Sequence, residues 1–217
     1  MPIRVLTINT GSSSIKATLY RIDGPEVAEV TASATRIGLS GGRLQIKDAH
    51  GETLLDQPDD LQNQAASLET FIGWLRDQKL ELNIDAIGHR VVHGGSKYRE
   101  PQLITTELVT ALKELIPIDP DHLPQALDAI HVTRRAFPAT PQVACFDTAF
   151  HRQMPRVAQL FALPRALTDA GLVRLGFHGL SYEYIVQELR GIDPGAVDGR
   201  VIIAHLGNGA SMAAVRA

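Results

Sequence analysis

The sequence predicts an α/β fold, a mixed sheet flanked by helices. Strand-like segments come first, and segments with helical and strand periodicity then alternate along the rest of the chain. The chain has 217 residues, of which 44% are hydrophobic and 21% charged. This length and balance are typical of a globular protein that buries a sizeable core.

The N-terminal part predicts an antiparallel meander. Residues 3–8 are mainly apolar and β-branched, and residues 15–20 alternate between apolar and polar side chains. The polar turn 9–14 joins these two strands. Two further strands are expected at 27–37 and 43–46.

Helices and buried strands are expected after the meander. Asp59 or Asp60 is predicted to cap a helix whose apolar side chains recur every three or four residues through Leu75. Thr106 is predicted to cap a second helix, which Pro117 ends. The other expected elements are strands at 84–92, 142–146, 201–206 and 210–217, and helices at 123–137 and 181–189.

A domain boundary is expected between about Asp147 and Pro155, which divides the chain into residues 1–150 and 151–217. A tight glycine turn at 207–209 leads into a return strand, and the sequence ends inside this predicted hairpin. The second domain is therefore expected to be truncated.

Charge and cysteine content exclude several classes of function. The formal net charge of -3 gives no overall field that would attract nucleic acid or an anionic membrane, so an anion must be held by a local site. No apolar run resembles a signal peptide or a membrane span. The only cysteine, Cys145, cannot form an intrachain disulfide, which favours a reducing cytoplasm. Cys145 is a nucleophile or a small core residue, and its apolar neighbours favour the core.

Two polar segments at predicted strand ends have the composition of anion sites. Residues 9–16 contain a glycine that allows close backbone approach, the hydroxyls of Ser12 and Ser14, and the charge of Lys16. An ordinary polar hairpin remains the alternative. In residues 88–95, Arg90 suits a carboxylate or phosphoryl group, because its guanidinium donates two parallel hydrogen bonds. A salt-bridged structural arginine is the alternative there.

Strand alternation places His89 and His93 on the face opposite Arg90. They are structural histidines or, with no third ligand near in sequence, weak metal-ligand candidates.

Three more segments carry candidate residues. Asp147 follows a buried strand, the place of a catalytic acid or base and equally of a helix cap. Phe177 and His178 lie between glycines, and His178 could donate to a developing negative charge. A second glycine turn, resembling a phosphate clamp, contains His205, Leu206, Gly207, Asn208 and Gly209. Two glycine turns, an arginine, an aspartate and a histidine together fit phosphoryl transfer.

These motifs closely resemble those of acetate kinases. Residues 5–16 and 87–95 match the two family signatures, and 146–155, 176–179 and 205–211 also match, in family order. The resemblance implies the fold of the acetate and sugar kinase, Hsp70 and actin superfamily, in which two ribonuclease-H-like domains enclose a cleft. Residues 1–150 would form the first domain, with the acyl-phosphate site, and the chain would be the N-terminal half of a family member.

The resemblance implies reversible, Mg²⁺-dependent transfer of a phosphoryl group from ATP to acetate, giving acetyl phosphate and ADP. Arg90 and Phe177 would bind the short carboxylate, Asp147 would be the acid/base, and His178 would stabilise the transition state. Asn9 would hold Mg²⁺. The nucleotide phosphates would contact Lys16, Ser12, Ser14, His205, Leu206, Gly207, Asn208 and Gly209.

The sequence departs from the family pattern at two positions and in length. Asp119 stands at a family histidine position, with His122 three residues later, and Tyr182 stands where many members have histidine. Complete members are nearly twice as long. Their later half supplies a second arginine, the adenosine pocket, a magnesium-binding glutamate and most of a homodimer interface. The isolated chain is therefore expected to be nearly inactive.

Three alternatives remain open. One is a non-catalytic phosphate or acyl-phosphate binding module, and another is a propionate or butyrate kinase. A ribonuclease-H-like nuclease is disfavoured, because that chemistry needs an aspartate on the first strand, where this chain has Asn9.

Overall fold

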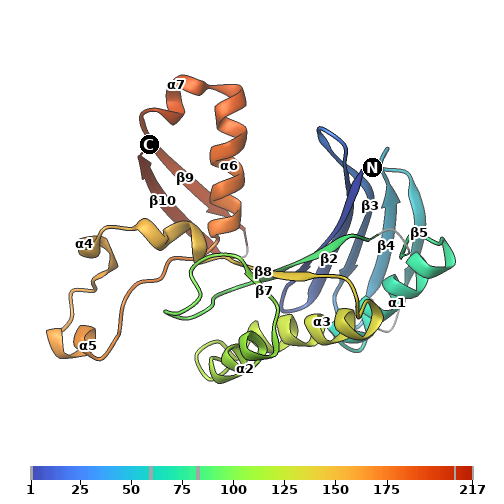
Figure 1. The fold of residues 1–217 in the computed structure, drawn as a ribbon, viewed down its shortest axis with the longest axis horizontal. Coiled ribbons are helices and arrows are strands. Elements are labelled where there is room, and N and C mark those ends of the chain that lie inside the picture. The colour runs from blue at the N-terminus through green and yellow to red at the C-terminus, as the bar shows by residue number, and fades with distance from the viewer. Residues whose placement is uncertain (1, 59–60, 82–83, 208, 217) are drawn as a thin grey trace. The chain divides into compact units, whose positions relative to one another are not determined.

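The computed structural model describes residues 2–58, 61–81, 84–207 and 209–216, which form two compact units (Figure 1). Unit 1 comprises Met1–Val91 and Gln102–Ala144, and unit 2 comprises Val92–Pro101 and Cys145–Ala217. Each unit is described by itself. The domain ranges 1–150 and 151–217 stay a prediction.

An eight-stranded mixed sheet organises unit 1, in the order β5-β4-β3-β2-β1-β6-β8-β7. Strands β1 to β4 pair antiparallel in sequence order, which confirms the predicted meander. Strand β5 extends it by one strand, and β6 pairs parallel with β1. The strands are β1 (Ile3–Thr10), β2 (Ser14–Ile22), β3 (Glu26–Thr35), β4 (Arg43–Asp48), β5 (Thr53–Pro58), β6 (Ala86–Val91), β7 (Gln102–Leu103) and β8 (Gln142–Phe146).

Helices α1 (Gln64–Asp77) and α3 (Leu123–Ala136) lie side by side against this sheet (Figure 1). The core forms between them and the inward side chains of the strands, among them Leu6 and Ile46, which have no exposed surface. Helix α2 (Thr106–Glu114) packs on α3. Alternate burial along β1, β2 and β6 leaves a polar face on the other side of the sheet.

Both predicted helix caps were wrong by a few residues. The Asn63 side chain caps α1 by accepting from the Ala66 N–H at 2.9 Å, so the helix begins later than predicted. Asp59 and Asp60 lie outside the described residues. Thr105 caps α2 by accepting from the Leu108 N–H at 3.2 Å. Asn63, three residues after Asp60, and Thr105, one residue before Thr106, have the extended backbone that a cap requires.

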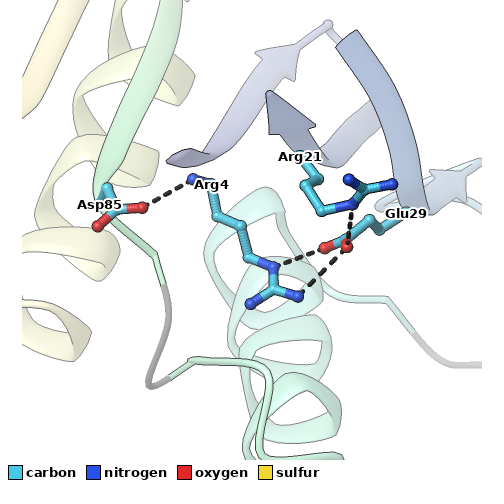
Figure 2. Close-up of polar contacts among 4 residues, drawn as sticks. All are labelled: Arg4, Arg21, Glu29 and Asp85. Atoms are coloured by element: carbon cyan, nitrogen blue, oxygen red, sulfur yellow. Dashed lines mark hydrogen bonds and ion pairs between the residues drawn. The ribbon is translucent and has the colours of Figure 1, made fainter. Parts of the chain in front are cut away.

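A charged cluster ties β1 to its neighbours near the start of that strand (Figure 2). Glu29 accepts from Arg4 Nε at 2.7 Å and lies 3.2 Å from Arg21 Nε. The hydrogen bond to Glu29 raises the pKa of the Arg4 guanidinium. The Arg4 backbone N–H donates to Asp85 Oδ2 at 2.7 Å, which joins β1 to the segment before β6.

Unit 2 has a much smaller core. Tyr182 packs with Ile203 and Ala213, between helix α6 (Gly179–Ile192) and the hairpin of β9 (Arg200–Leu206) and β10 (Ala210–Arg216). The rest of the unit is short elements: a 3₁₀ helix (Ala149–Gln153), α4 (Arg156–Gln159), α5 (Arg165–Asp169) and α7 (Pro194–Val197). Among the helices of both units, as far as they are described, none has the length and apolarity to cross a bilayer.

Candidate functional site

Unit 1 gathers three of the predicted site residues on the polar face of its sheet. Asn9 on β1 lies directly opposite Lys16 on β2, and both side chains are exposed. Because Ile8 pairs with His89 in the parallel β1–β6 ladder, Arg90 lies beside Asn9. Arg90 Nη1 donates to Asn9 Oδ1 at 2.9 Å. This face therefore presents two cations and an amide to an anion.

The glycine loop between β1 and β2 is held by helix α1. The Gly11 N–H donates to the Ser14 carbonyl at 2.7 Å and closes the loop. Gln64, the first residue of α1, donates from Nε2 to the carbonyls of Gly11 and Ser12 at 3.2 and 2.8 Å. The sequence argument did not single out Gln64. The only signal in the sequence that could have indicated its contact with the loop is its polar amide at the start of the helix expected after the meander.

A buried polar triad lies behind Arg90, on the core side of β6. His89 Nε2 lies 3.0 Å from Gln142 Oε1, on β8, and 3.3 Å from Thr133 Oγ1, on α3. Desolvation lowers the pKa of His89 to about 4, so the ring is neutral at pH 7. His89 is therefore a satisfied structural histidine that links β6 to β8 and α3.

Metal ligation receives no support from the histidine pair. His93 lies beyond β6, and its Nδ1 accepts from the Gly95 N–H at 3.2 Å. In the described part of the chain, no three His, Cys, Asp or Glu side chains gather as metal ligands would. Asn9 offers one amide oxygen, which already accepts from Arg90. Because Mg²⁺ is usually held by carboxylates and phosphates, the single amide oxygen of Asn9 would be one ligand of such a site and not the whole of it.

In unit 2, two close approaches explain the glycines around His178. The Gly179 N–H donates to the Asp147 carbonyl at 2.8 Å, and a Cβ on Gly179 would lie 2.1 Å from that oxygen. Gly176 has a positive φ of 79°, and its Cβ would lie 2.4 Å from the His151 ring. Asp147 has 1% of its surface exposed. The glycines therefore bring the strand-end aspartate and the His178 segment into contact.

His178 and His205 form a stacked pair beside a serine. Their ring centroids lie 4.2 Å apart with 18° between the planes. His178 Nδ1 lies 2.7 Å from Ser211 Oγ, which also contacts the Tyr182 hydroxyl, and His205 Nδ1 lies 3.0 Å from Ser181 Oγ. The sequence argument gave Ser181 no role and included Ser211 only as the last residue of the matched segment 205–211. The hairpin register places Ser211 opposite His205.

His178 also has a strained backbone. It precedes α6 in the left-handed backbone conformation, with φ of 56°. Histidine adopts this conformation more readily than most residues, and residues in it are concentrated at functional sites. Phe177, next to it, is 44% exposed, and its ring meets that of His93 edge-on at 6.5 Å. Unit 2 thus presents an aromatic ring and two imidazoles.

The second glycine turn follows β9. The Gly207 N–H donates to the Gly209 carbonyl at 3.0 Å, and Leu206 is exposed. A Cβ on Gly209 would lie 3.9 Å from His178 Cε1, so this end of the turn lies close to the histidine pair. Asn208 lies outside the described residues.

Asp119, His122 and Cys145, which the sequence analysis also considered, do not contribute to the faces described above. His122 Nδ1 lies 2.8 Å from Asp119 Oδ1, so the two residues that stand near the family histidine position pair with each other. Cys145 is half-buried, and burial raises the pKa of its thiol, which disfavours the nucleophilic thiolate. Two open cavities of unit 1, of about 300 and 460 Å³, are lined by other residues than the predicted site residues.

Known proteins match nearly the whole chain. It is 43% identical to the acetate kinase of Methylocella silvestris over 222 residues, and 37% identical to that of Thermotoga maritima over 221 residues. These alignments cover 98% and 99% of the chain but 55% and 54% of the two relatives. The chain thus spans about half the length of the curated relatives it matches.

Solved structures agree with the sequence relatives. The crystal structure of Porphyromonas gingivalis acetate kinase superposes with a TM-score of 0.82 at 34% identity, over 99% of this chain and 55% of that one. A propionate kinase from Francisella tularensis gives a TM-score of 0.84 at 32% identity, over 98% and 54%. These neighbours have an actin-like ATPase fold, which confirms the predicted fold class. Residues 4–217 match the acetokinase family, and the chain therefore belongs to that family.

Proposed function

We propose that this chain supplies the carboxylate-binding part of a kinase that transfers a phosphoryl group between ATP and acetate. The observation that carries the proposal is the polar face of unit 1, where Arg90 donates to Asn9 beside Lys16 at the positions of the two family signatures. A binding module without catalysis would need the same face, so turnover is the property to test.

In the proposed reaction a carboxylate oxygen of acetate attacks the γ-phosphorus of ATP. The new O–P bond forms as the bond to the bridging oxygen of ADP breaks, so no proton has to move. Both partners are anionic, and their repulsion must be offset by fixed cations. Arg90 binds the carboxylate and the moving phosphoryl oxygens, His178 donates to the same oxygens, and Phe177 contacts the apolar end of the acid.

Asp147 has a limited role as a base in this reaction. The substrate is a carboxylic acid with a pKa of about 4, so it is already ionised at neutral pH and offers no proton for a base to remove. We assign Asp147 to orienting the donors around the phosphoryl group, and to proton exchange only when the acid binds in its protonated form. Its buried position after β8 suits an orienting group.

The nucleotide phosphates are assigned to the two glycine turns. Lys16, Ser12 and Ser14 come from the first turn, and His205, Leu206, Gly207, Asn208 and Gly209 from the second. When bound, Mg²⁺ would neutralise phosphate charge. Asn9 would offer it a single amide oxygen, and we propose that it arrives with the nucleotide phosphates. Cytoplasmic location and homodimerisation of a full-length member stay predictions.

Propionate is a second candidate substrate, because one of the superposed structures is a propionate kinase. One methylene in an apolar pocket changes binding by only about 1–3 kcal/mol, so the fold alone does not choose between the two acids. Relative kcat/KM for acetate, propionate and butyrate measures this choice directly.

The proposal is tested by acetyl phosphate formation, trapped as the hydroxamate. We would assay the chain alone and the chain joined to the part of the Methylocella silvestris enzyme that lies beyond the aligned segment. We expect almost no turnover from the chain alone and ATP-dependent turnover from the joined protein. The Arg90→Ala variant should lower kcat/KM by about 100- to 1000-fold, because one transition-state donor is lost.

Arg134→Ala is the matched control, since Arg134 is an exposed arginine on α3. It should leave kcat/KM unchanged. A joined protein that folds but makes no acetyl phosphate from any of the three acids would contradict the proposed function. Full activity in the Arg90 variant would contradict the role given to Arg90.

A further inference from the structure

Two hydroxyl groups of unit 2 lie in a row that ends at the His178 ring. The Tyr182 hydroxyl contacts Ser211 Oγ, and Ser211 Oγ lies 2.7 Å from His178 Nδ1. The Tyr182 N–H donates to the His178 carbonyl at 3.2 Å, so these two residues are one turn apart at the start of α6. Ser211 comes from β10, in the hairpin that packs against α6 (Figure 1). We call Tyr182 and Ser211 the hydroxyl pair.

Packing fixes the position of the Tyr182 hydroxyl. Only 1% of Tyr182 is exposed, and the ring centroids of Phe150 and His151 each lie 5.7 Å from its own. A buried hydroxyl proton without an acceptor is strongly unfavourable, so buried tyrosines donate to a neighbouring group. Within the described residues, Ser211 Oγ is the hydrogen-bond partner of this hydroxyl. Tyr182 therefore donates and Ser211 accepts.

The count of protons then decides the role of His178. A serine hydroxyl has one proton to donate and two lone pairs to accept with. One lone pair of Ser211 is used by Tyr182, and its other partner among the described residues is His178 Nδ1. The Ser211 proton therefore points to Nδ1, which accepts. In a neutral imidazole the ring proton is then on Nε2.

We propose that Tyr182 and Ser211 are positioning residues that select the Nε2–H tautomer of His178. The inference rests on the proposed function, in which His178 donates to the moving phosphoryl oxygens. A neutral imidazole has one N–H, so a ring protonated at Nδ1 would have no donor at Nε2. His178 Cε1, next to Nε2, lies 3.9 Å from the Cβ position of Gly209, in the turn assigned to the nucleotide phosphates. The hydroxyl pair thus gives His178 a donor without requiring a charged ring.

His205 offers an internal comparison. Its ring stacks on that of His178 at 4.2 Å, and its Nδ1 lies 3.0 Å from Ser181 Oγ. In the described part of the chain, no second hydroxyl donates to Ser181 Oγ, so the direction of this serine proton is not determined in the same way. A change at Ser181 should therefore alter the ring signals of His205 and leave the tautomer of His178 as it is.

Heteronuclear NMR of the histidine ring nitrogens measures the tautomer in the 217-residue chain and needs no activity. The protonated and unprotonated nitrogens of a neutral imidazole have well-separated shifts, and the signals missing in His178→Gln identify those of His178. At about pH 8.5 an ordinary imidazole is uncharged. We expect the Nε2–H tautomer of His178 to exceed the Nδ1–H tautomer by at least about 20-fold, because Nδ1 accepts a hydrogen bond.

Variants test the two hydroxyls separately. Tyr182→Phe keeps the buried ring and removes its hydroxyl, which leaves Ser211 able to accept from Nδ1–H. The tautomer ratio of His178 should then fall by at least about 5-fold. Ser211→Ala should lower the ratio as much and move the Nδ1 signal toward that of a nitrogen without a hydrogen bond. Tyr184→Phe is the matched control, since Tyr184 on the same helix is 55% exposed, and it should leave the ratio within about 2-fold.

Activity of the joined protein tests the consequence of the tautomer. Tyr182→Phe should lower kcat by about 5- to 10-fold and leave KM for acetate within about 2-fold, because the His178 donor acts mainly in the transition state. An unchanged kcat beside a changed tautomer ratio would overturn the positioning role.

Three NMR results would also overturn the proposal. One is an Nδ1–H tautomer as the main form of His178 in the unaltered chain. Another is an unchanged ratio in Tyr182→Phe, and the third is an equal change in Tyr182→Phe and Tyr184→Phe. If the expected tautomers are found in a joined protein that makes no acetyl phosphate, tautomer selection by the hydroxyl pair is supported and the proposed function is contradicted.

Discussion

The two units differ in how well their own residues support the predicted site. In unit 1, Asn9, Lys16 and Arg90 stand on three neighbouring strands above a large core closed by α1 and α3. In unit 2, His178 and His205 are held by glycine contacts, serines and a core of three buried residues. Unit 1 therefore holds its cations on a large core, whereas unit 2 holds its histidines on a small one.

The largest difference between the two units is expected in the unfolding free energy that each loses when a buried core side chain is shortened. Leu6→Ala removes a fully buried side chain from the enclosed core of unit 1, and we expect it to cost about 2–5 kcal/mol. Ile203→Ala should cost about 1–2 kcal/mol, because the hairpin can relax around the smaller side chain. Denaturant unfolding followed by the fluorescence of Trp74, the only tryptophan, reports on unit 1, and hydrogen exchange reports on unit 2. Equal costs would contradict the comparison.

Acid should weaken unit 1 through His89. Its pKa is about 4 in the folded chain and about 6.5 when unfolded, so between these values the unfolded chain binds a proton that the folded chain does not. The free energy of unfolding should therefore fall as pH falls from 6.5 to 4, by up to about 3 kcal/mol. His89→Gln should remove this part of the slope, and His131→Gln, at an exposed position of α3, should retain it. An identical slope in both variants would refute the prediction.

A methyl group at Gly179 should disturb the close approach of α6 to the Asp147 carbonyl. Gly179→Ala places its Cβ 2.1 Å from the Asp147 carbonyl oxygen, and relieving that overlap should cost about 1–3 kcal/mol. Gly191 lies in the same helix with no atom within 4 Å of its Cβ position. Gly191→Ala should therefore stabilise α6 by about 0.4–1 kcal/mol. Thermal unfolding of both variants compares them, and a harmless Gly179→Ala would show that the loop moves freely.

The smallest effect is expected at the charged cluster of Figure 2. Glu29→Gln leaves Arg4 and Arg21 without their shared carboxylate, but these ion pairs are partly exposed. We expect a loss of about 1 kcal/mol or less, smaller in 0.5 M salt. Glu52→Gln, at an exposed position before β5, should change nothing measurable. A loss above about 2 kcal/mol would mean that the cluster stabilises unit 1 as much as its core does.

Periodicity predicted the elements that bury one face. The meander strands, β6, β8, β9 and helices α1, α3 and α6 all lie where alternation or helical spacing placed them, within a few residues. Strands β5 and β7 were not predicted: β5 is an edge strand with largely exposed side chains, and β7 has two residues. The short helices α4, α5 and α7 have no apolar stripe to recognise.

The positions of site residues could be predicted from the sequence where strand alternation alone determines the face on which a side chain lies. Alternation placed Arg90 and His89 on opposite faces of β6, and the structure confirms this. The contacts of Gln64 with the glycine loop, and of Ser181 and Ser211 with the histidines, depend on segments that are distant in sequence. Local pattern carries no information on such pairs, so they emerged only from the fold.

Hydrogen exchange tests most directly the claim that unit 1, with its large core, is much more stable than unit 2. Amides of β1, β2 and β6, which carry Asn9, Lys16 and Arg90, should exchange with the full unfolding free energy of unit 1. Amides of β9 and β10 should exchange by local opening, at least about 100-fold faster. Equal protection of the two sets would contradict the account, because the hairpin on its small core would then be as stable as the large sheet of unit 1.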